Sequence, residues 1–384
     1  MDLLNDRSPE RSSGFKGEKE RMTTLSYSAS GNGTRATRPR STMRDVAALA
    51  GVSLKTVSRV VNRESGVRPE MADRVRQAAD QLDYRPDFTA SNLRRADRRT
   101  GTIGLLVEDV GNEFSATVHA GVEQAARERG VAVLTASTAD DPGRERDSVR
   151  AFSSRRVDGL VAVPSGGVDS SLWIERDIGV PLVFVDRAPK GVVADCVLTN
   201  NREGTHEGVD HLIAQGHRKI AFLGGVSRLE TAQERYEGYI DSLTAAGLAS
   251  RPSWVLRDLR NPDEATEAAE ALLGLVDPPT AIFAAQNLIC MGAFRALARA
   301  NLHRSIALAG FDDFALADML DPAVTVIAQD PWNIGYRAAK LLFERMDDDA
   351  SAPDEAHSAA TIHEIPSRLI VRASSLTPPR ELAL

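Results

Sequence analysis

A short stretch of the chain, residues 42–62, carries side chains whose types and spacing suit the reading of DNA. Within SLKTVSRVVN, Lys55 and Arg59 are four residues apart, which places them on one side of a helix. Long cationic side chains can donate to the O6 and N7 atoms of guanine in the major groove. Leu54 offers an apolar contact to a thymine methyl group, and Ser58 points to the same outward side. The pattern predicts a helix that reads base edges.

Short polar side chains around this helix suit contacts with phosphates. Hydroxyl and amide donors fix the register of a protein on the duplex but carry no sequence information themselves. The residues to which we assign this role are Thr42, Ser53, Thr56 and Asn62.

Three short helical patterns would position these donors. Thr42 and Asp45 are spaced as a capping box, and Gly51 supplies a left-handed residue that ends the first helix. Ser53 caps the second helix, and Pro69 opens a third at its first position. Two short helices joined by such a turn have the spacing of a helix-turn-helix. The buried stripe of the third helix is expected to contain Met71, Val75, Ala78, Ala79 and Leu82.

From Gly101 onward, apolar runs such as TIGLLVE, PLVFVD and TAIFAA alternate with helical segments. Strands that are apolar along their whole length are buried on both faces, which is typical of parallel sheets covered by helices. These units are too many for one small sheet, and a break near residues 198–201 predicts two doubly wound lobes. We therefore expect an α/β fold with a small all-α headpiece.

Charge is divided unevenly along the 384 residues. Residues 1–100 carry 20 Lys and Arg against 13 Asp and Glu, although the whole chain has a net charge of −7. A basic end on an acidic body fits a protein that touches phosphates at one end only. No apolar run approaches the ~18 residues that cross a bilayer, and no secretory signal is visible near the N-terminus. We expect a cytoplasmic, nucleoid-associated protein in which Cys196 and Cys290 are buried thiols.

Motifs for enzyme chemistry are missing from the sequence. There is no Walker A sequence, no G-x-G-x-x-G after the first strand and no nucleophile elbow. The cysteines have no partner at metal-ligand spacing. We therefore expect a protein that is not an enzyme, with no metal and no cofactor. An enzyme on a doubly wound fold remains an alternative, because fold alone does not determine function.

The segments TMRDVAALAGVSLKTVSRVVN and VRQAADQLDYRPDFTASNL resemble the headpiece of the lactose repressor (LacI/GalR) family of bacterial transcriptional regulators. The resemblance extends from Thr42 to about Ser375. It implies a hinge helix after the third helix, with Pro86, Ala90 and Leu93 at the matching positions. Ala90 and Leu93 would contact DNA, where the leucine wedges into the minor groove and bends the duplex.

The same resemblance implies a two-lobed domain like that of periplasmic sugar-binding proteins, with a ligand held between the lobes. The effector-binding residues that it implies are Phe114, Asp186, Arg187, Arg235, Gln286 and Asp312. Carboxylate, guanidinium and amide groups can share the hydroxyls of a sugar or polyol while an aromatic ring covers its apolar side. The family commonly has Asn-Asp where this chain has Gln286 and Asn287, so one charge is lost.

The sequence thus predicts a DNA-binding transcriptional regulator that acts as a repressor. Its expected partners are double-stranded operator DNA, a small-molecule effector and a second copy in a homodimer, with no membrane. A nucleoside or purine-type effector, or a solute-binding protein without DNA function, are the alternatives. Translation starts at Met1 or Met22. The expected domains are a disordered extension (1–41), the headpiece (42–85), a hinge helix and linker (86–100), the two-lobed domain (101–376) and a flexible tail (377–384).

Overall fold

A computed structural model describes residues 41–61, 65–84, 99–166, 172, 179–189, 194–351 and 360–379. The chain divides into two compact units, Met1–Pro86 and Asp87–Leu384. The predicted hinge positions Pro86, Ala90 and Leu93, together with Asn62, lie outside the described residues. Most of the predicted N-terminal extension lies outside them as well, although the Ser41 hydroxyl donates to the Leu82 carbonyl at 2.7 Å.

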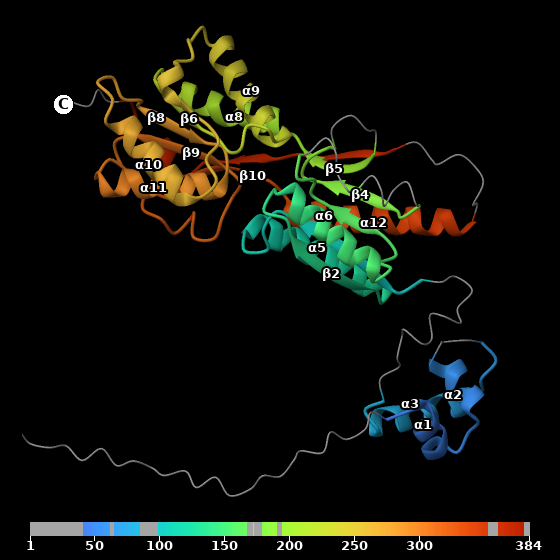
Figure 1. The fold of residues 1–384 in the computed structure, drawn as a ribbon. Coiled ribbons are helices and arrows are strands. Elements are labelled where there is room, and N and C mark those ends of the chain that lie inside the picture. The colour runs from blue at the N-terminus through green and yellow to red at the C-terminus, as the bar shows by residue number, and fades with distance from the viewer. Residues whose placement is uncertain are drawn as a thin grey trace, which may run out of the picture. The chain divides into compact units, whose positions relative to one another are not determined.

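The described part of the first unit is a headpiece of three helices (Figure 1). Its helices are α1 (Met43–Ala50), α2 (Leu54–Val61) and α3 (Pro69–Gln81). They pack around a small core of Val46, Ala50, Val57, Val75 and Ala78. The prediction that Met71 is buried was wrong: Met71 is 39% exposed and Ala72 is buried instead. The buried face of α3 runs along positions spaced by three residues, and Met71 lies at its rim.

Within its described residues, the second unit contains two six-stranded sheets, each the centre of one lobe. Lobe A is built on the sheet with strand order β11-β5-β4-β3-β1-β2. Its strands are β1 (Thr102–Val107), β2 (Ala132–Ser137), β3 (Leu160–Ala162), β4 (Leu182–Val185), β5 (Asp195–Thr199) and β11 (Ile362–Ile365). Its helices are α5 (Glu113–Arg129), α6 (Pro142–Ser154) and α12 (Pro331–Ser351).

Lobe B is built on the sheet with strand order β12-β10-β9-β8-β6-β7. Its strands are β6 (Ile220–Leu223), β7 (Val255–Leu256), β8 (Ala281–Ala284), β9 (Ala307–Phe311), β10 (Thr325–Ala328) and β12 (Arg368–Ile370). Its helices are α8 (Asn201–Ala214), α9 (Glu230–Ala245), α10 (Pro262–Leu273) and α11 (Asn287–Arg299), with short 3-10 turns at Pro252–Trp254 and Ala373–Ser375.

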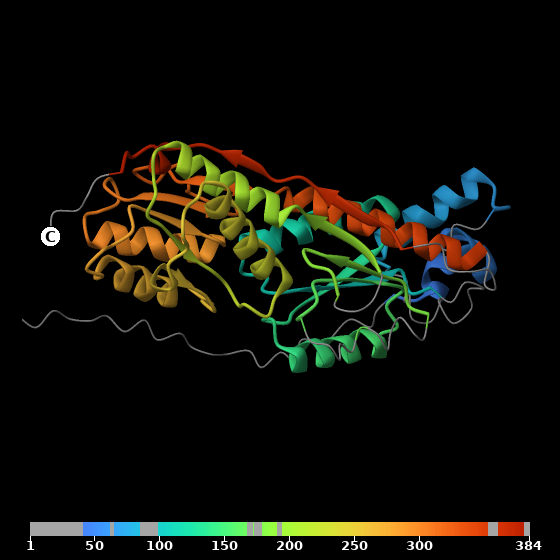
Figure 2. The same cartoon turned by 90° about the horizontal axis from the view of Figure 1, so that it is seen from above.

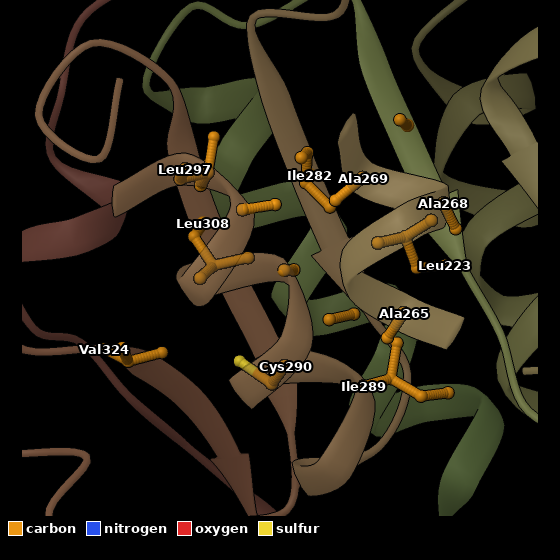
Figure 3. Close-up of a cluster of buried hydrophobic side chains, with 14 of the residues drawn as sticks. Leu223, Ala265, Ala268, Ala269, Ile282, Ile289, Cys290, Leu297, Leu308 and Val324 are labelled. Carbon is orange, nitrogen blue, oxygen red and sulfur yellow. The ribbon is translucent and has the colours of Figure 1, made fainter. Parts of the chain in front are cut away.

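Helices cover both faces of each sheet, as the continuous apolar strands predicted. In lobe A, α5 and α12 share one apolar core with the sheet, and α6 contributes to another on the opposite face. In lobe B, α8 and α9 cover one face while α10 and α11 cover the other. Figure 3 shows Cys290 within this last core, near Ile289 and Leu308. Both cysteines are buried free thiols, as expected.

The chain crosses between the lobes several times, whereas the sequence suggested one break. The first crossing is at the predicted place, between β5 in lobe A and α8 in lobe B. The second joins β10 in lobe B to α12, which packs on lobe A. The third joins β11, parallel to β5, to β12, antiparallel to β10. In Figure 2 this red C-terminal segment runs from one lobe to the other.

The register of the parallel strands aligns their carboxyl ends at one edge of each sheet. In lobe A, Leu106 of β1 pairs with Ala162 of β3, which pairs with Phe184 of β4. In lobe B, Leu223 of β6 pairs with Ala284 of β8, which pairs with Gly310 of β9. The residues that follow these strands therefore gather at one edge of each lobe, where ligands bind in open α/β sheets.

The end of lobe B extends slightly beyond the boundary expected from the sequence. His217 is fully buried, and its Nε2 atom lies 2.9 Å from the Thr377 carbonyl oxygen. Its Nδ1 atom lies 3.0 Å from the Thr280 hydroxyl. Thr377, which the sequence assigned to a flexible tail, is thus attached to lobe B.

None of the helices in the described part of the chain is long and apolar enough to span a bilayer.

Candidate functional site

The helix-turn-helix is fixed by the caps that the sequence predicted. The Thr42 amide donates to the Asp45 carboxylate at 2.7 Å, and the Asp45 amide donates back to the Thr42 hydroxyl at 3.4 Å. The hydrogen bonds that the Asp45 carboxylate accepts from the Thr42 amide and hydroxyl lower the pKa of Asp45. Gly51 closes α1 with φ of +62°, and a Cβ there would lie 2.8 Å from the Arg74 guanidinium. Because Arg74 also donates to the Ala50 carbonyl at 2.5 Å, α3 holds the turn before α2 in place.

Helix α2 has the two faces that the sequence predicted. Val57 is fully buried in the headpiece core, while Leu54 is 46% exposed. Lys55 is exposed as well, and Ser58 and Arg59 are half-buried. Since Leu54 and Lys55 open the helix, the exposed face lies at the N-terminal end, which is where recognition helices meet base edges.

The hydroxyls predicted to hold phosphates are partly engaged in caps. The Thr42 hydroxyl donates to Asp45 at 2.7 Å. The Ser53 hydroxyl oxygen accepts from the Thr56 amide at 3.1 Å and lies 2.9 Å from the Thr56 hydroxyl. These residues shape the starts of α1 and α2. Their contact with phosphate stays a prediction.

Lobe A contributes a buried guanidinium held between carboxylates. Asp186 and Arg187 follow β4, and Arg187 donates to the Asp186 carboxylate at 3.0 Å and to the Asp140 carboxylate at 3.1 Å. The Arg187 side chain is only 4% exposed. Burial and the nearby Asp140 carboxylate raise the pKa of Glu108, at the end of β1, to about 7. The sequence indicated Asp186 and Arg187, but neither Asp140 nor Glu108.

Lobe B contributes a second buried pair. Arg235 of α9 donates to the Asp312 carboxylate at 3.4 Å and to the Asn201 side-chain oxygen at 2.8 Å. It also donates to the Ala285 carbonyl at 2.8 Å, and its guanidinium lies 3.8 Å from the centre of the Phe311 ring. These contacts hold the guanidinium in one orientation beside the carboxylate.

The two halves of the site face each other closely enough for their charges to interact. Burial raises the pKa of Asp312, and the Asp186 carboxylate of the other lobe adds to this rise, whereas Arg235 opposes it. Gln329, at the end of β10, donates to Asp312 at 2.5 Å. The structure therefore brings four of the predicted residues together as two buried pairs, Asp186–Arg187 and Arg235–Asp312.

Phe114 and Gln286 lie at the edges of this arrangement. Phe114, near the start of α5, lines a cavity of about 320 Å³ together with Asp312, Gln329 and Pro331. The other four predicted effector residues do not line this cavity. Gln286 is half-buried at the start of α11 and makes no capping bond with its side chain.

Direct hydrogen bonds join the two lobes beside the site. The Asn287 side chain donates to the Asn112 side-chain oxygen at 2.9 Å. Arg228 of lobe B donates to two lobe A carbonyls, that of Asp140 at 2.6 Å and that of Ser165. Sequence reasoning missed these bridges because their partners are far apart along the chain. The departure at Asn287 from the family's usual Asp was the one available signal.

Metal chemistry has no support in the part of the chain that the structure describes. No group of three or more His, Cys, Asp or Glu side chains there is arranged to hold a metal ion. Two carboxylates of the site are instead paired with guanidinium groups, Asp186 with Arg187 and Asp312 with Arg235. Such a site can bind a polar molecule through hydrogen bonds.

Both the headpiece and the two-lobed unit resemble known proteins. Residues 42–87 match the family described as bacterial regulatory proteins, lacI family, and residues 209–375 match a periplasmic binding protein-like domain. The HTH-type transcriptional repressor PurR of Aliivibrio salmonicida is 30% identical over 336 residues, covering 87% of this chain and 98% of PurR. The ribose operon repressor of Haemophilus influenzae is 33% identical over 307 residues, covering 79% of this chain and 92% of the repressor.

Solved structures show the same architecture. The lac repressor dimer bound to operator and the anti-inducer ONPF is 25% identical, with a TM-score of 0.74, covering 88% of this chain and all of that chain (100%). The transcriptional regulator CelR in complex with cellobiose is 29% identical, with a TM-score of 0.64 and the same coverage of 88% and 100%. This chain belongs to the lacI family of bacterial regulatory proteins, and it is a DNA-binding transcriptional repressor rather than an enzyme.

Proposed function

We propose that a neutral, sugar-like molecule bound between lobes A and B sets the affinity of this repressor for its operator. The observation that carries the proposal is the pair of buried ion pairs, Arg235–Asp312 and Asp186–Arg187, that face each other from the two lobes. A ligand that contacts both pairs would link the lobes. Ligand binding would then favour one lobe arrangement over another, which is the condition for changing operator affinity.

The chemistry of the two pairs suits adjacent hydroxyl groups. A carboxylate accepts from a hydroxyl while the guanidinium beside it donates to the next oxygen. The Phe311 ring and the Asn201 side chain hold the Arg235 guanidinium in place, so that little side-chain freedom is lost on binding. Phe114 offers an apolar surface at the adjoining cavity.

The balance of charge favours a ligand without an anionic group. Arg187 is shared by two carboxylates and Arg235 is paired with Asp312. Glu113, Asp313 and Asp318 line the adjoining cavity, where Arg372 already binds Asp313 at 2.7 Å. A phosphate group would meet like charges in a partly buried site, which is costly. Sugar phosphates are therefore disfavoured relative to the free sugar.

A purine-type ligand is the second candidate. The relatives named PurR support it, as the ribose operon repressor supports a sugar. The amide side chains of Asn112 and Asn287 meet beside the site, and an amide can both donate and accept, as recognition of a base requires. Phe114 could stack on a planar ring.

On the DNA side, we propose that a homodimer binds an operator of two related half-sites, with Leu54, Lys55, Ser58 and Arg59 at the base edges. Thr42, Ser53, Thr56 and Asn62 would hold phosphates, and Ala90 and Leu93 would enter the minor groove. A solved relative is a dimer bound to operator, and a two-fold protein matches a palindromic site. Such a regulator works in the cytoplasm, where the chromosome lies.

Thermal unfolding of the full chain with a panel of small molecules tests the ligand. We expect ribose or another neutral monosaccharide to raise the melting temperature in proportion to the logarithm of its concentration. Ribose 5-phosphate should produce a smaller rise or none. Stabilisation by hypoxanthine or guanine with none by any sugar would establish the second candidate. Stabilisation by ribose 5-phosphate alone would contradict the neutral-ligand proposal.

A further inference from the structure

Two ion pairs meet on one carboxylate beside Arg99, at the start of the described part of the second unit. Arg99 is the first described residue after the headpiece, and its guanidinium lies 3.3 Å from the Asp347 carboxylate near the end of α12. It also donates to the Met346 carbonyl. Arg129, the last residue of α5, donates to the same carboxylate at 2.8 Å and lies 4.9 Å from the centre of the Phe343 ring. Asp347, near the end of α12, thus links Arg99 to the end of α5.

A second carboxylate fixes the next three residues. The Asp158 side chain accepts from the amides of Thr100 and Gly101, both at 2.6 Å, and from the Thr102 amide at 3.2 Å. Hydrogen bonds to a charged acceptor are stronger than those between neutral groups. The path from Arg99 into β1 is therefore held in one position on lobe A.

The other end of α12 lies at the effector site. Pro331, its first residue, lines the cavity with Phe114, and Gln329 just before it donates to Asp312. From Pro331 to Asp347 the helix rises by roughly 24 Å. A Cβ on Gly335 would lie 2.0 Å from the Val118 carbonyl oxygen, so α12 and α5 are in direct backbone contact there. Figure 1 shows α12 running the length of lobe A. Helix α12 thus connects the effector site to the ion pair between Asp347 and Arg99.

We infer that Asp347 is a positioning residue, which couples the lobe arrangement at the effector site to the chain segment at Arg99, just before β1. The inference rests on the DNA-binding function of the family and not on the identity of the effector. The side chains of Arg99, Arg129 and Asp347 are 30%, 38% and 51% exposed. Ion pairs this exposed contribute little to stability. A large effect of their loss on operator affinity would therefore reflect positioning.

A double-mutant cycle on the full chain tests this inference. The operator is a duplex recovered by selection with the wild-type protein, and its dissociation constant is measured for wild type, Asp347→Ala, Arg228→Ala and the double variant. Asp277 provides a matched control, because it is 43% exposed and binds Lys219 and Arg251 on lobe B. We expect Asp347→Ala to change operator affinity about five-fold or more, and Asp277→Ala to change it less than two-fold.

The decisive result is the interaction between the two variants. Arg228→Ala removes the bonds from lobe B to Asp140 and Ser165, and should alter operator affinity in the wild-type background. In the Asp347→Ala background its effect should fall to less than half, on a logarithmic scale, because a change in the lobe arrangement would no longer reach Arg99 through Asp347. Asp347→Glu should restore coupling. Two outcomes would overturn the inference. In one, the effects of Asp347→Ala and Arg228→Ala on the operator dissociation constant simply multiply in the double variant. In the other, Asp347→Ala changes operator affinity no more than Asp277→Ala does. If Asp347→Ala melts below the control, Asp347→Asn replaces it in the cycle.

Discussion

The outward face of α2 and the site between lobes A and B are built in opposite ways. Residues 54–59 of the α2 face are contiguous and partly exposed to solvent, and a single buried contact, Val57, anchors them to the headpiece core. The site between the lobes is assembled from segments far apart in the chain, and its charges are buried and paired. A change on α2 can therefore alter recognition alone, whereas a change in the site alters stability and recognition together.

The largest expected effect is that of Arg235→Ala. This change leaves the Asp312 carboxylate buried without its guanidinium, and losing one partner of a buried pair costs about 3–5 kcal/mol of unfolding free energy. Urea unfolding followed by tryptophan fluorescence measures the loss. The double variant Arg235→Ala/Asp312→Asn should recover part of it, because the uncompensated charge is gone. A single variant as stable as wild type would show that the pair is not buried in the working protein.

Changes on the outward face of α2 should alter DNA recognition and leave stability unchanged. Lys55→Ala or Arg59→Ala should each reduce discrimination between the preferred base and its alternatives by about 1–3 kcal/mol if the side chain binds a base edge. The melting temperature should stay within a degree or so of wild type. Arg76→Ala on α3, where Arg76 pairs with Asp73 at the surface, is the control. If Lys55→Ala, Arg59→Ala and Arg76→Ala weaken binding to every duplex equally, Lys55 and Arg59 contact phosphates and do not read bases.

The turn that sets α2 in place can be tested at Gly51. Gly51→Ala places a Cβ on a backbone with φ of +62°, which costs about 1–2 kcal/mol, and adds a contact 2.8 Å from Arg74. Gly130→Ala is the matched control, because Gly130 has φ of +67° with open space around it. Thermal unfolding of the two units separates the effects. If both variants lose the same stability, the Arg74 contact adds nothing.

Smaller effects of pH should differ in sign between the lobes. Glu108 in lobe A has a folded pKa of about 7, above its ordinary 4.5, so it favours the folded state at low pH, and this contribution is lost as pH rises from 4.5 through 7. Burial lowers the pKa of His217 in lobe B below 6.5, so its contribution is present above 6.5 and lost as pH falls. Glu108→Gln and His217→Gln should each flatten one limb of the stability profile between pH 5 and about 7.5. A profile that neither variant changes would contradict both assignments.

The contrast between the two regions also explains what the sequence could predict. The caps at Thr42 and Ser53, the turn at Gly51 and the buried Val57 follow from spacing within one short segment. The apolar strands predicted the covered parallel sheets for the same reason. The prediction that Met71 is buried was wrong because a stripe through Met71 and a stripe through Ala72 both have helical spacing. Packing against α1 and α2 decides which of the two faces the core.

Contacts across the site depend on distances that no local pattern contains. Asn287 and Asn112, which are 175 positions apart, meet only because the two lobes face each other. Asp140 has no sequence signal as a partner of Arg187, because its position depends on the turn after β2. The antiparallel β12 was missed because a three-residue strand carries too little periodicity to reveal its direction.

Selection of binding sites from random duplex DNA tests the division of roles most directly, with wild type, Arg59→Ala and Asp186→Asn compared as full chains. Wild type should enrich two related half-sites. Arg59→Ala should lose the preference at particular positions of each half-site, while Asp186→Asn should keep every preference and change only the affinity. An Arg59→Ala selection identical to wild type, or altered base preferences in Asp186→Asn, would contradict the assignment of base reading to α2 and of effector response to the site between the lobes.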